Sequence, residues 1–110
     1  MTYFPKYIFA QECNNPLGMQ SKSIPDESIT SSSKLDSDHE AYYGRLGGEN
    51  AWCSTIEDEN PHIEITLDEE KAITEIATQG SLSDLIWSKK FEIEYLEGGK
   101  WTSYKQVNLK

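Results

Sequence analysis

Hydrophobic and polar residues alternate strictly over two stretches in the second half of the chain, at 62–67 and 90–96. A period of two puts successive side chains on opposite faces of an extended backbone, so each stretch predicts a half-buried β-strand. The side chains predicted to face the inside of a β-sandwich or barrel are Ile63, Ile65 and Leu67 in the first strand, and Phe91, Ile93 and Tyr95 in the second.

Glycine and polar runs around these strands predict turns and loops. Glu97-Gly98-Gly99 predicts a tight hairpin, because a positive φ costs glycine little, and 101–106 is then the returning strand. The β-branched run 72–79 predicts another strand, which ends at Gly80. Loops are predicted at 13–33 (with short extended pieces), 33–40, 57–61, 68–71 and 81–88. Since no helical period or internal repeat is present, the pattern predicts an all-β domain.

Composition predicts a small core. The length of 110 residues fits one domain, and three Trp, six Tyr and three Phe supply bulky core side chains. A hydrophobic fraction of 36% nevertheless indicates a thin core beneath a large surface. Because Trp52, Trp87 and Trp101 each adjoin a predicted strand or turn, we expect all three in the core.

The charge balance limits the classes of partner. Nineteen acidic and ten basic residues give a formal net charge of −9, spread over several segments. This charge opposes binding to a nucleic-acid backbone or to an anionic membrane leaflet. No stretch approaches the roughly 18 apolar residues that would span a bilayer.

Motifs of catalysis and of metal binding are absent from the sequence. It lacks the signatures of phosphate-binding loops, serine hydrolases and zinc hydrolases, and therefore does not indicate an enzyme. Cys13, His39, Cys53 and His62 lack the paired spacing of a structural zinc site. The cysteines fit three arrangements that the residues alone do not separate: a Cys13–Cys53 bridge, two free thiols, or pairing with cysteines outside this sequence.

One acidic loop has a spacing that can hold calcium. Asp36, Asp38 and Glu40 occupy alternate positions, as oxygen ligands do when they wrap a Ca²⁺ ion. The glycine and the terminal glutamate of an EF-hand are missing, so a solvated acidic loop is the favoured interpretation and calcium the alternative.

A series of short motifs runs from residue 13 to about 106. They are Pro16-Leu17-Gly18-Met19, Ile24-Pro25-Asp26, Ile29-Thr30-Ser31-Ser32-Ser33, Tyr43-Gly44-Arg45-Leu46, Ala51-Trp52-Cys53, Ile63-Glu64-Ile65-Thr66-Leu67, Ala77-Thr78-Gln79-Gly80, and Trp87 with Phe91-Glu92-Ile93-Glu94-Tyr95. In this order and spacing they resemble a discoidin domain, also called a coagulation factor 5/8 type C domain. Within that family the chain looks most similar to the discoidin-domain receptors.

The resemblance implies a distorted jelly-roll β-barrel or sandwich of the galactose-binding-domain-like type, in an extracellular protein. It assigns 13–110 to the N-terminal part of the domain and 1–12 to an extension, and implies that closing strands are missing at the C-terminus. We therefore expect exposed strand edges and apolar surface. Family members pair the cysteines aligned with Cys13 and Cys53 with later cysteines, which favours partners outside this sequence.

The resemblance also places ligand contacts in three loops, 34–40, 47–50 and 81–87. The candidate binding residues are Leu35, Asp36, Asp38, His39, Glu49, Asn50, Ser81 and Leu82. Leu35, His39 and Ser81 replace a tryptophan, a threonine and an arginine of the collagen-binding receptors, whereas Glu49 keeps an acidic position. Arg45 is expected to be structural, because its forked guanidinium suits loop carbonyls or a carboxylate.

Such domains catalyse no reaction and need no cofactor. The first functional hypothesis is a cell-adhesion or receptor module that binds an extracellular protein such as collagen. The alternatives are a carbohydrate-binding, lectin-like module, helped by Ca²⁺ at Asp36 and Asp38, and a phospholipid-binding module of the same fold.

Overall fold

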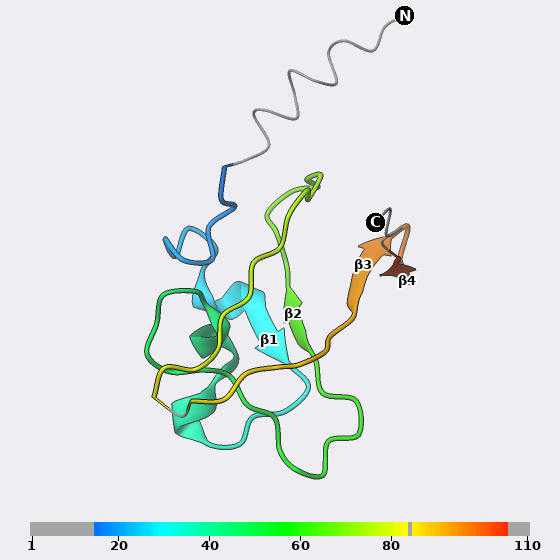
Figure 1. Cartoon of the computed structure of the whole chain (residues 1–110). Helices are drawn as coiled ribbons and strands as arrows, with labels where there is room; N and C mark the ends of the chain where they lie inside the picture. The colour runs from blue at the N-terminus through cyan, green and yellow to red at the C-terminus, as the bar shows by residue number, and fades with distance from the viewer. Residues whose placement is uncertain (1–14, 84, 106–110) are drawn as a thin grey trace, which may run out of the picture.

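The computed structural model describes residues 15–83 and 85–105, so predictions about Cys13, Gln106 and the segment 1–12 lie outside it. Its regular elements are η1 (Asp26–Ser28), β1 (Ile29–Ser31), η2 (Ser37–His39), η3 (Ala41–Gly44), β2 (Ile63–Ile65), β3 (Ile93–Glu97) and β4 (Lys100–Tyr104), as Figure 1 shows. The η elements are single turns of 3-10 helix, and no α-helix occurs in the described ranges. Nor do these ranges hold a helix able to cross a membrane. The all-β prediction is thus confirmed.

The first sheet joins segments that are far apart in the chain. β1 and β2 pair antiparallel, with Ile29 opposite Ile65 and Ser31 opposite Ile63. Two backbone hydrogen bonds extend this ladder, from the Ser32 amide to the His62 carbonyl and from the Thr66 amide to the Ser28 carbonyl. The strand predicted at 62–67 is therefore confirmed in its centre. β1 lies in a segment for which the sequence indicated only short extended pieces.

The second sheet is the hairpin predicted at Glu97-Gly98-Gly99. β3 and β4 pair antiparallel, with Ile93 opposite Tyr104 and Leu96 opposite Trp101. Gly98 and Gly99 have φ values of 61° and 77°, the pair of positive values that a two-residue turn needs to match the twist of its strands. The hairpin prediction is confirmed.

The core of the described residues is as thin as the composition predicted. Ile24, Ile29 and Ala41 are its buried hydrophobic residues, and the partly buried side chains of Met19, Tyr42, Trp52, Ile63 and Leu67 pack around them. The core therefore lies between β1, β2 and η3. This body, at 15–67, is the part of the chain that shapes the first two of the predicted binding loops.

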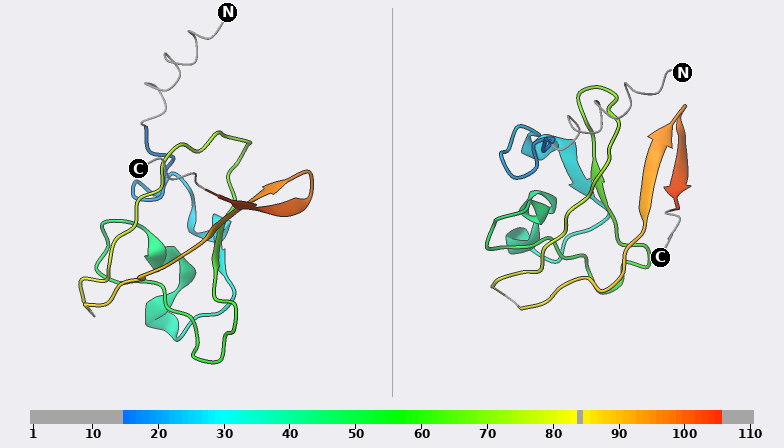
Figure 2. Two further views of the ribbon diagram at one scale, coloured as in Figure 1. Left: turned by 45° about the vertical axis from the view of Figure 1, so that its right-hand side comes forward. Right: turned by 45° about the horizontal axis from the view of Figure 1, so that its top comes forward.

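Several burial predictions were wrong. Ile65, Phe91 and Tyr95 are 41%, 55% and 45% exposed, and Trp87 and Trp101 are also exposed. For Tyr95 and Trp101 the reason is that β3 and β4 pair only with each other, and Figures 1 and 2 show their hairpin standing away from the β1–β2 sheet. Ile65 is the last residue of β2, and Trp87 and Phe91 lie before β3 begins. The two sheets of the described residues do not close into a barrel. The expectation of exposed apolar surface holds instead.

Two further predictions concern the run 72–79 and the three tryptophans. The run 72–79 forms no strand, and Ile73 and Ile76 are exposed. Trp52 alone of the three tryptophans packs against the core, and its indole Nε1 donates a 2.8 Å hydrogen bond to the Ser33 carbonyl.

Candidate functional site

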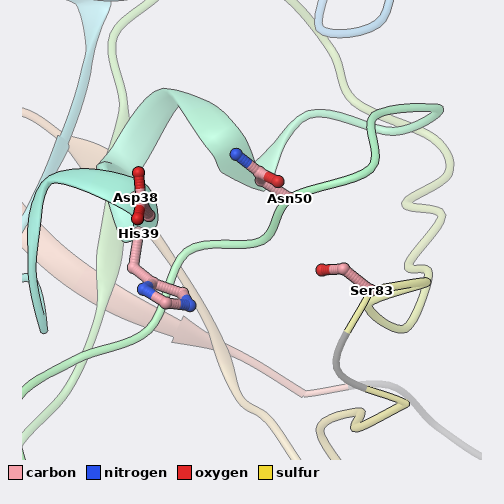
Figure 3. Close-up of a pocket in the computed structure, with 4 residues that line it drawn as sticks. All are labelled: Asp38, His39, Asn50 and Ser83. Carbon is pink, nitrogen blue, oxygen red and sulfur yellow. The ribbon is translucent and has the colours of Figure 1, made fainter.

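The three loops predicted to bind ligand surround one hollow of about 300 Å³. Its lining residues are Asp38 and His39 from η2, Asn50 from the second loop and Ser83 from the third. Figure 3 shows the Ser83 hydroxyl pointing from its loop toward the space that the other three residues border. We call this feature the loop hollow. Its lining offers a carboxylate, an imidazole, an amide and a hydroxyl, which are groups that donate and accept hydrogen bonds.

The first loop, 34–40, is braced by its own side chains. The Asp36 carboxylate accepts a 2.9 Å hydrogen bond from the Asp38 amide and lies 2.6 Å from His39 Nδ1, while Lys34 and Glu40 form an ion pair across the ends of the loop. The hydrogen bond with His39, together with that from the Asp38 amide, holds the pKa of the Asp36 carboxyl below its ordinary value. The loop thus has a defined shape before any ligand arrives.

The same contacts bear on the calcium alternative, which rested on the alternating acidic residues of the first loop. Asp36 faces His39 and a backbone amide, and Glu40 faces Lys34, so these carboxylates do not converge on one point. The described part of the chain contains no group of three His, Cys, Asp or Glu side chains that could hold a metal ion. The structure therefore gives the calcium alternative no support at this loop.

The second and third loops are each fixed by hydrogen bonds that their backbone amides donate. In the second, the Gly47 amide donates to Oε1 of Gln79 over 3.0 Å. In the third, the Ser81 amide donates to the Ile86 carbonyl over 2.8 Å, and the Leu85 amide donates to the Ser81 carbonyl over 3.1 Å. The third loop is therefore a closed turn that presents Ser83 at its tip.

The predicted binding residues divide into three groups. Asp38, His39 and Asn50 line the loop hollow. Leu35, Glu49 and Leu82 are exposed on the same loops without lining it. Asp36 braces the first loop, and Ser81 is buried at the base of the third. Ser83 was missed because a serine in a polar loop carries no signal beyond its position.

Two polar networks hold the surrounding chain. Arg45 donates from Nη1 to the Met19 carbonyl over 2.8 Å and from Nη2 to Asp26 over 2.6 Å, which confirms the structural role predicted for it. Asp58 accepts hydrogen bonds of 2.6 Å from both Ser32 and Ser33, and thereby fixes the loop before β2 to the end of β1. Cys53 is half-buried, and its pairing with a cysteine outside this sequence stays a prediction.

A model of the F5/8 type C domain matches residues 28–110 of this chain, which is most of its length. The chain belongs to the F5/8 type C family. This confirms the family that the motifs resembled, and with it a galactose-binding-like β-sandwich as the fold class. The placement near the discoidin-domain receptors stays a prediction.

Individual relatives of this F5/8 type C chain agree with the assignment. It is 38% identical to coagulation factor V of Sus scrofa over 104 residues, 35% identical to the venom prothrombin activator omicarin-C non-catalytic subunit of Oxyuranus microlepidotus, and 32% identical to EGF-like repeat and discoidin I-like domain-containing protein 3 of Mus musculus. Each comparison covers 86% of this chain but only 5%, 7% and 22% of the respective relative. No solved structure gave a significant match.

The family assignment fixes the general kind of activity. F5/8 type C domains are binding modules without catalytic activity, and the relatives above are secreted or extracellular proteins. Since the chain spans a small part of each relative, their whole-protein activities do not transfer to it. The ligand has to be inferred from the loops themselves.

Proposed function

We propose that this chain is an extracellular recognition module that binds a protein ligand through the three loops around the loop hollow, and that a collagen-like matrix protein is the first candidate. The observation that supports this proposal is the convergence of Asp38, Asn50 and Ser83, which come from three separate parts of the sequence, on one hollow. Loops carried by a braced scaffold are a common location for binding residues.

The chemistry of the loop surface suits a protein ligand. The hollow is polar, whereas Leu35 and Leu82, on the loops around it, are 48% and 64% exposed. Polar groups beside exposed apolar side chains are typical of protein interfaces, in which apolar contacts are surrounded by hydrogen bonds. The ion pair of Lys34 and Glu40 and the Asp36 contacts pre-order the first loop, which lowers the entropy cost of binding.

The test is a solid-phase binding assay of the chain on a panel of collagens. Leu35→Ala and Glu49→Ala should each weaken binding about five- to thirtyfold, because a contact at the centre of an interface contributes on the order of 1–2 kcal/mol. Ile56→Ala is the matched control, since Ile56 is 90% exposed and lies outside the three loops. Absence of collagen binding, or equal binding by all variants, rules out the collagen version.

A carbohydrate ligand is the second candidate, and the polar lining of the loop hollow favours it. A carboxylate, an amide, an imidazole and a hydroxyl can together match the donors and acceptors of sugar hydroxyl groups. A glycan array probed with and without a chelator separates the two candidates. Binding to a defined glycan that Asn50→Ala abolishes supports a sugar site, and a flat profile in both conditions rules it out.

A further inference from the structure

Gln79 lies outside all three loops and lines no part of the hollow, yet it connects two of the loops. Its side-chain oxygen Oε1 accepts the 3.0 Å hydrogen bond from the Gly47 amide, at the start of the second loop. Its backbone is separated from the third loop only by Gly80. Asn50 and Ser83, which border the hollow, follow Gly47 and Gln79 by a few residues each.

The Gly80 end of this connection is closely packed, and the Gly47 end has a backbone conformation that favours glycine. A Cβ atom at Gly80 would lie 3.0 Å from the Ile86 carbonyl oxygen and 3.1 Å from Trp87 Cβ, so the backbone beside Gln79 is packed against the far side of the third loop. Gly47 has a φ of +82°, which an L side chain adopts only with strain, and a Cβ there would lie 2.6 Å from Nε2 of the exposed Gln20 side chain. Neither loop can shift along this connection without breaking the hydrogen bond of Gln79 or displacing packed atoms.

We propose that Gln79 is a positioning residue of the binding site, whose acceptor oxygen holds the second loop in place against the third and so sets the separation of Asn50 and Ser83. This inference rests on the proposed function. The requirement is specific for an acceptor, because the partner is a backbone N–H and only Oε1 of the amide can accept it. A side chain of the same size that lacks an acceptor oxygen should therefore not replace Gln79.

Two substitutions separate the acceptor from the volume of the side chain. Gln79→Met keeps the length of the side chain but removes the acceptor, whereas Gln79→Glu keeps an acceptor oxygen. Amide hydrogen exchange at Gly47 should be about three- to tenfold faster in Gln79→Met and close to wild type in Gln79→Glu, as expected for loss of one partly solvated hydrogen bond. Glu75→Met, an exposed position in the same segment, controls for the added methionine.

The second measurement is binding of the same variants to the collagen panel and the glycan array. Gln79→Met should lose about three- to tenfold in affinity for the probe that wild type binds, with rescue by Gln79→Glu and no effect of Glu75→Met. Equal exchange at Gly47 in wild type and Gln79→Met overturns the positioning role, whatever the binding result. If exchange changes as expected but wild type binds no probe, the proposed function fails while the positioning role of Gln79 stands.

Discussion

The two antiparallel sheets of this chain differ in what covers them. β1 and β2 lie over Ile24 and Ala41, and Ile29, the first residue of β1, is only 4% exposed. In β3 and β4, by contrast, Tyr95, Leu96, Trp101 and Tyr104 are all about half exposed. The short sheet is part of a core, and the longer one is a hairpin stabilised by its own turn and its cross-strand pairs.

This difference shows that alternation along a strand and burial of its apolar face are separate properties. Alternation is local and follows from the backbone, whereas burial needs another element to pack against the apolar side. β1 and β2 have η3 and the chain around Ile24 as such a partner. Within the described residues, β3 and β4 pair only with each other, and most of their apolar side chains stay exposed.

The sharpest test of this comparison is to truncate one large side chain in each sheet. Ile29→Ala should lower the free energy of unfolding by about 2–5 kcal/mol, because it opens a cavity in a small core. Trp101→Ala should cost about 1 kcal/mol or less, since Trp101 is 48% exposed and lies in a hairpin in which Leu96 is its cross-strand partner. Urea denaturation followed by circular dichroism measures both values, and equal losses would contradict the division into a packed and an unpacked sheet.

Glycine substitutions provide a second contrast. Gly18 has a φ of 126°, and a Cβ there would lie 2.7 Å from Ser23 Cβ, so Gly18→Ala should destabilise by about 1–3 kcal/mol through strain and a steric clash. At Gly98 φ is 61° and a Cβ would meet no atom within 4 Å, so Gly98→Ala should cost only the backbone strain of about 1 kcal/mol. Thermal unfolding of both variants checks this order, which the reverse result would refute.

The smallest expected effect is a pH dependence of stability, and it arises at the β1–β2 sheet. Hydrogen bonds from Ser32 and then Ser33 hold the pKa of the Asp58 carboxyl below its ordinary value. A carboxyl with a lowered folded pKa contributes stability above its unfolded pKa of about 3.9, and this contribution is lost as pH falls through the folded value. Asp58→Asn should therefore be less stable than wild type at pH 6, and the gap should shrink toward pH 3.

Urea titrations at pH 6, 5, 4 and 3 measure this gap. Ser32→Ala removes one hydrogen-bond donor and keeps the Asp58 carboxylate. Its stability difference from wild type should shrink toward pH 3 in the same way. A constant difference between wild type and Asp58→Asn over the whole range would show that the carboxylate contributes no pH-dependent stability.

Local chemistry explains which parts of the fold were predictable. The hairpin could be predicted because Gly98 and Gly99 specify its turn, and β2 could be predicted because its apolar residues alternate. β1 was not recognised as a strand, since its pairing depends on β2, more than 30 residues later. The exposure of Trp87 and Phe91 could not be predicted from the sequence either, because it depends on which elements pack beside these side chains.

The candidate site was predictable to a similar degree. The resemblance to the discoidin family pointed to three loops, and the structure brings Asp38, His39 and Asn50 together at the hollow, while their role in binding stays a prediction. The bracing role of Asp36 and the connection made by Gln79 could not be read from the sequence. Both depend on hydrogen bonds whose partners become neighbours only when the chain folds.

The open turn of the hairpin has a practical consequence. Gly98 and Gly99 have no atom within 4 Å of where a side chain would begin, and Figures 1 and 2 show this turn at the other end of the molecule from the third loop. A biotin acceptor peptide or a dye-labelling tag inserted there would leave the proposed recognition loops unobstructed. When the chain is immobilised on a sensor surface through this turn, its loops would face the solution in one uniform orientation.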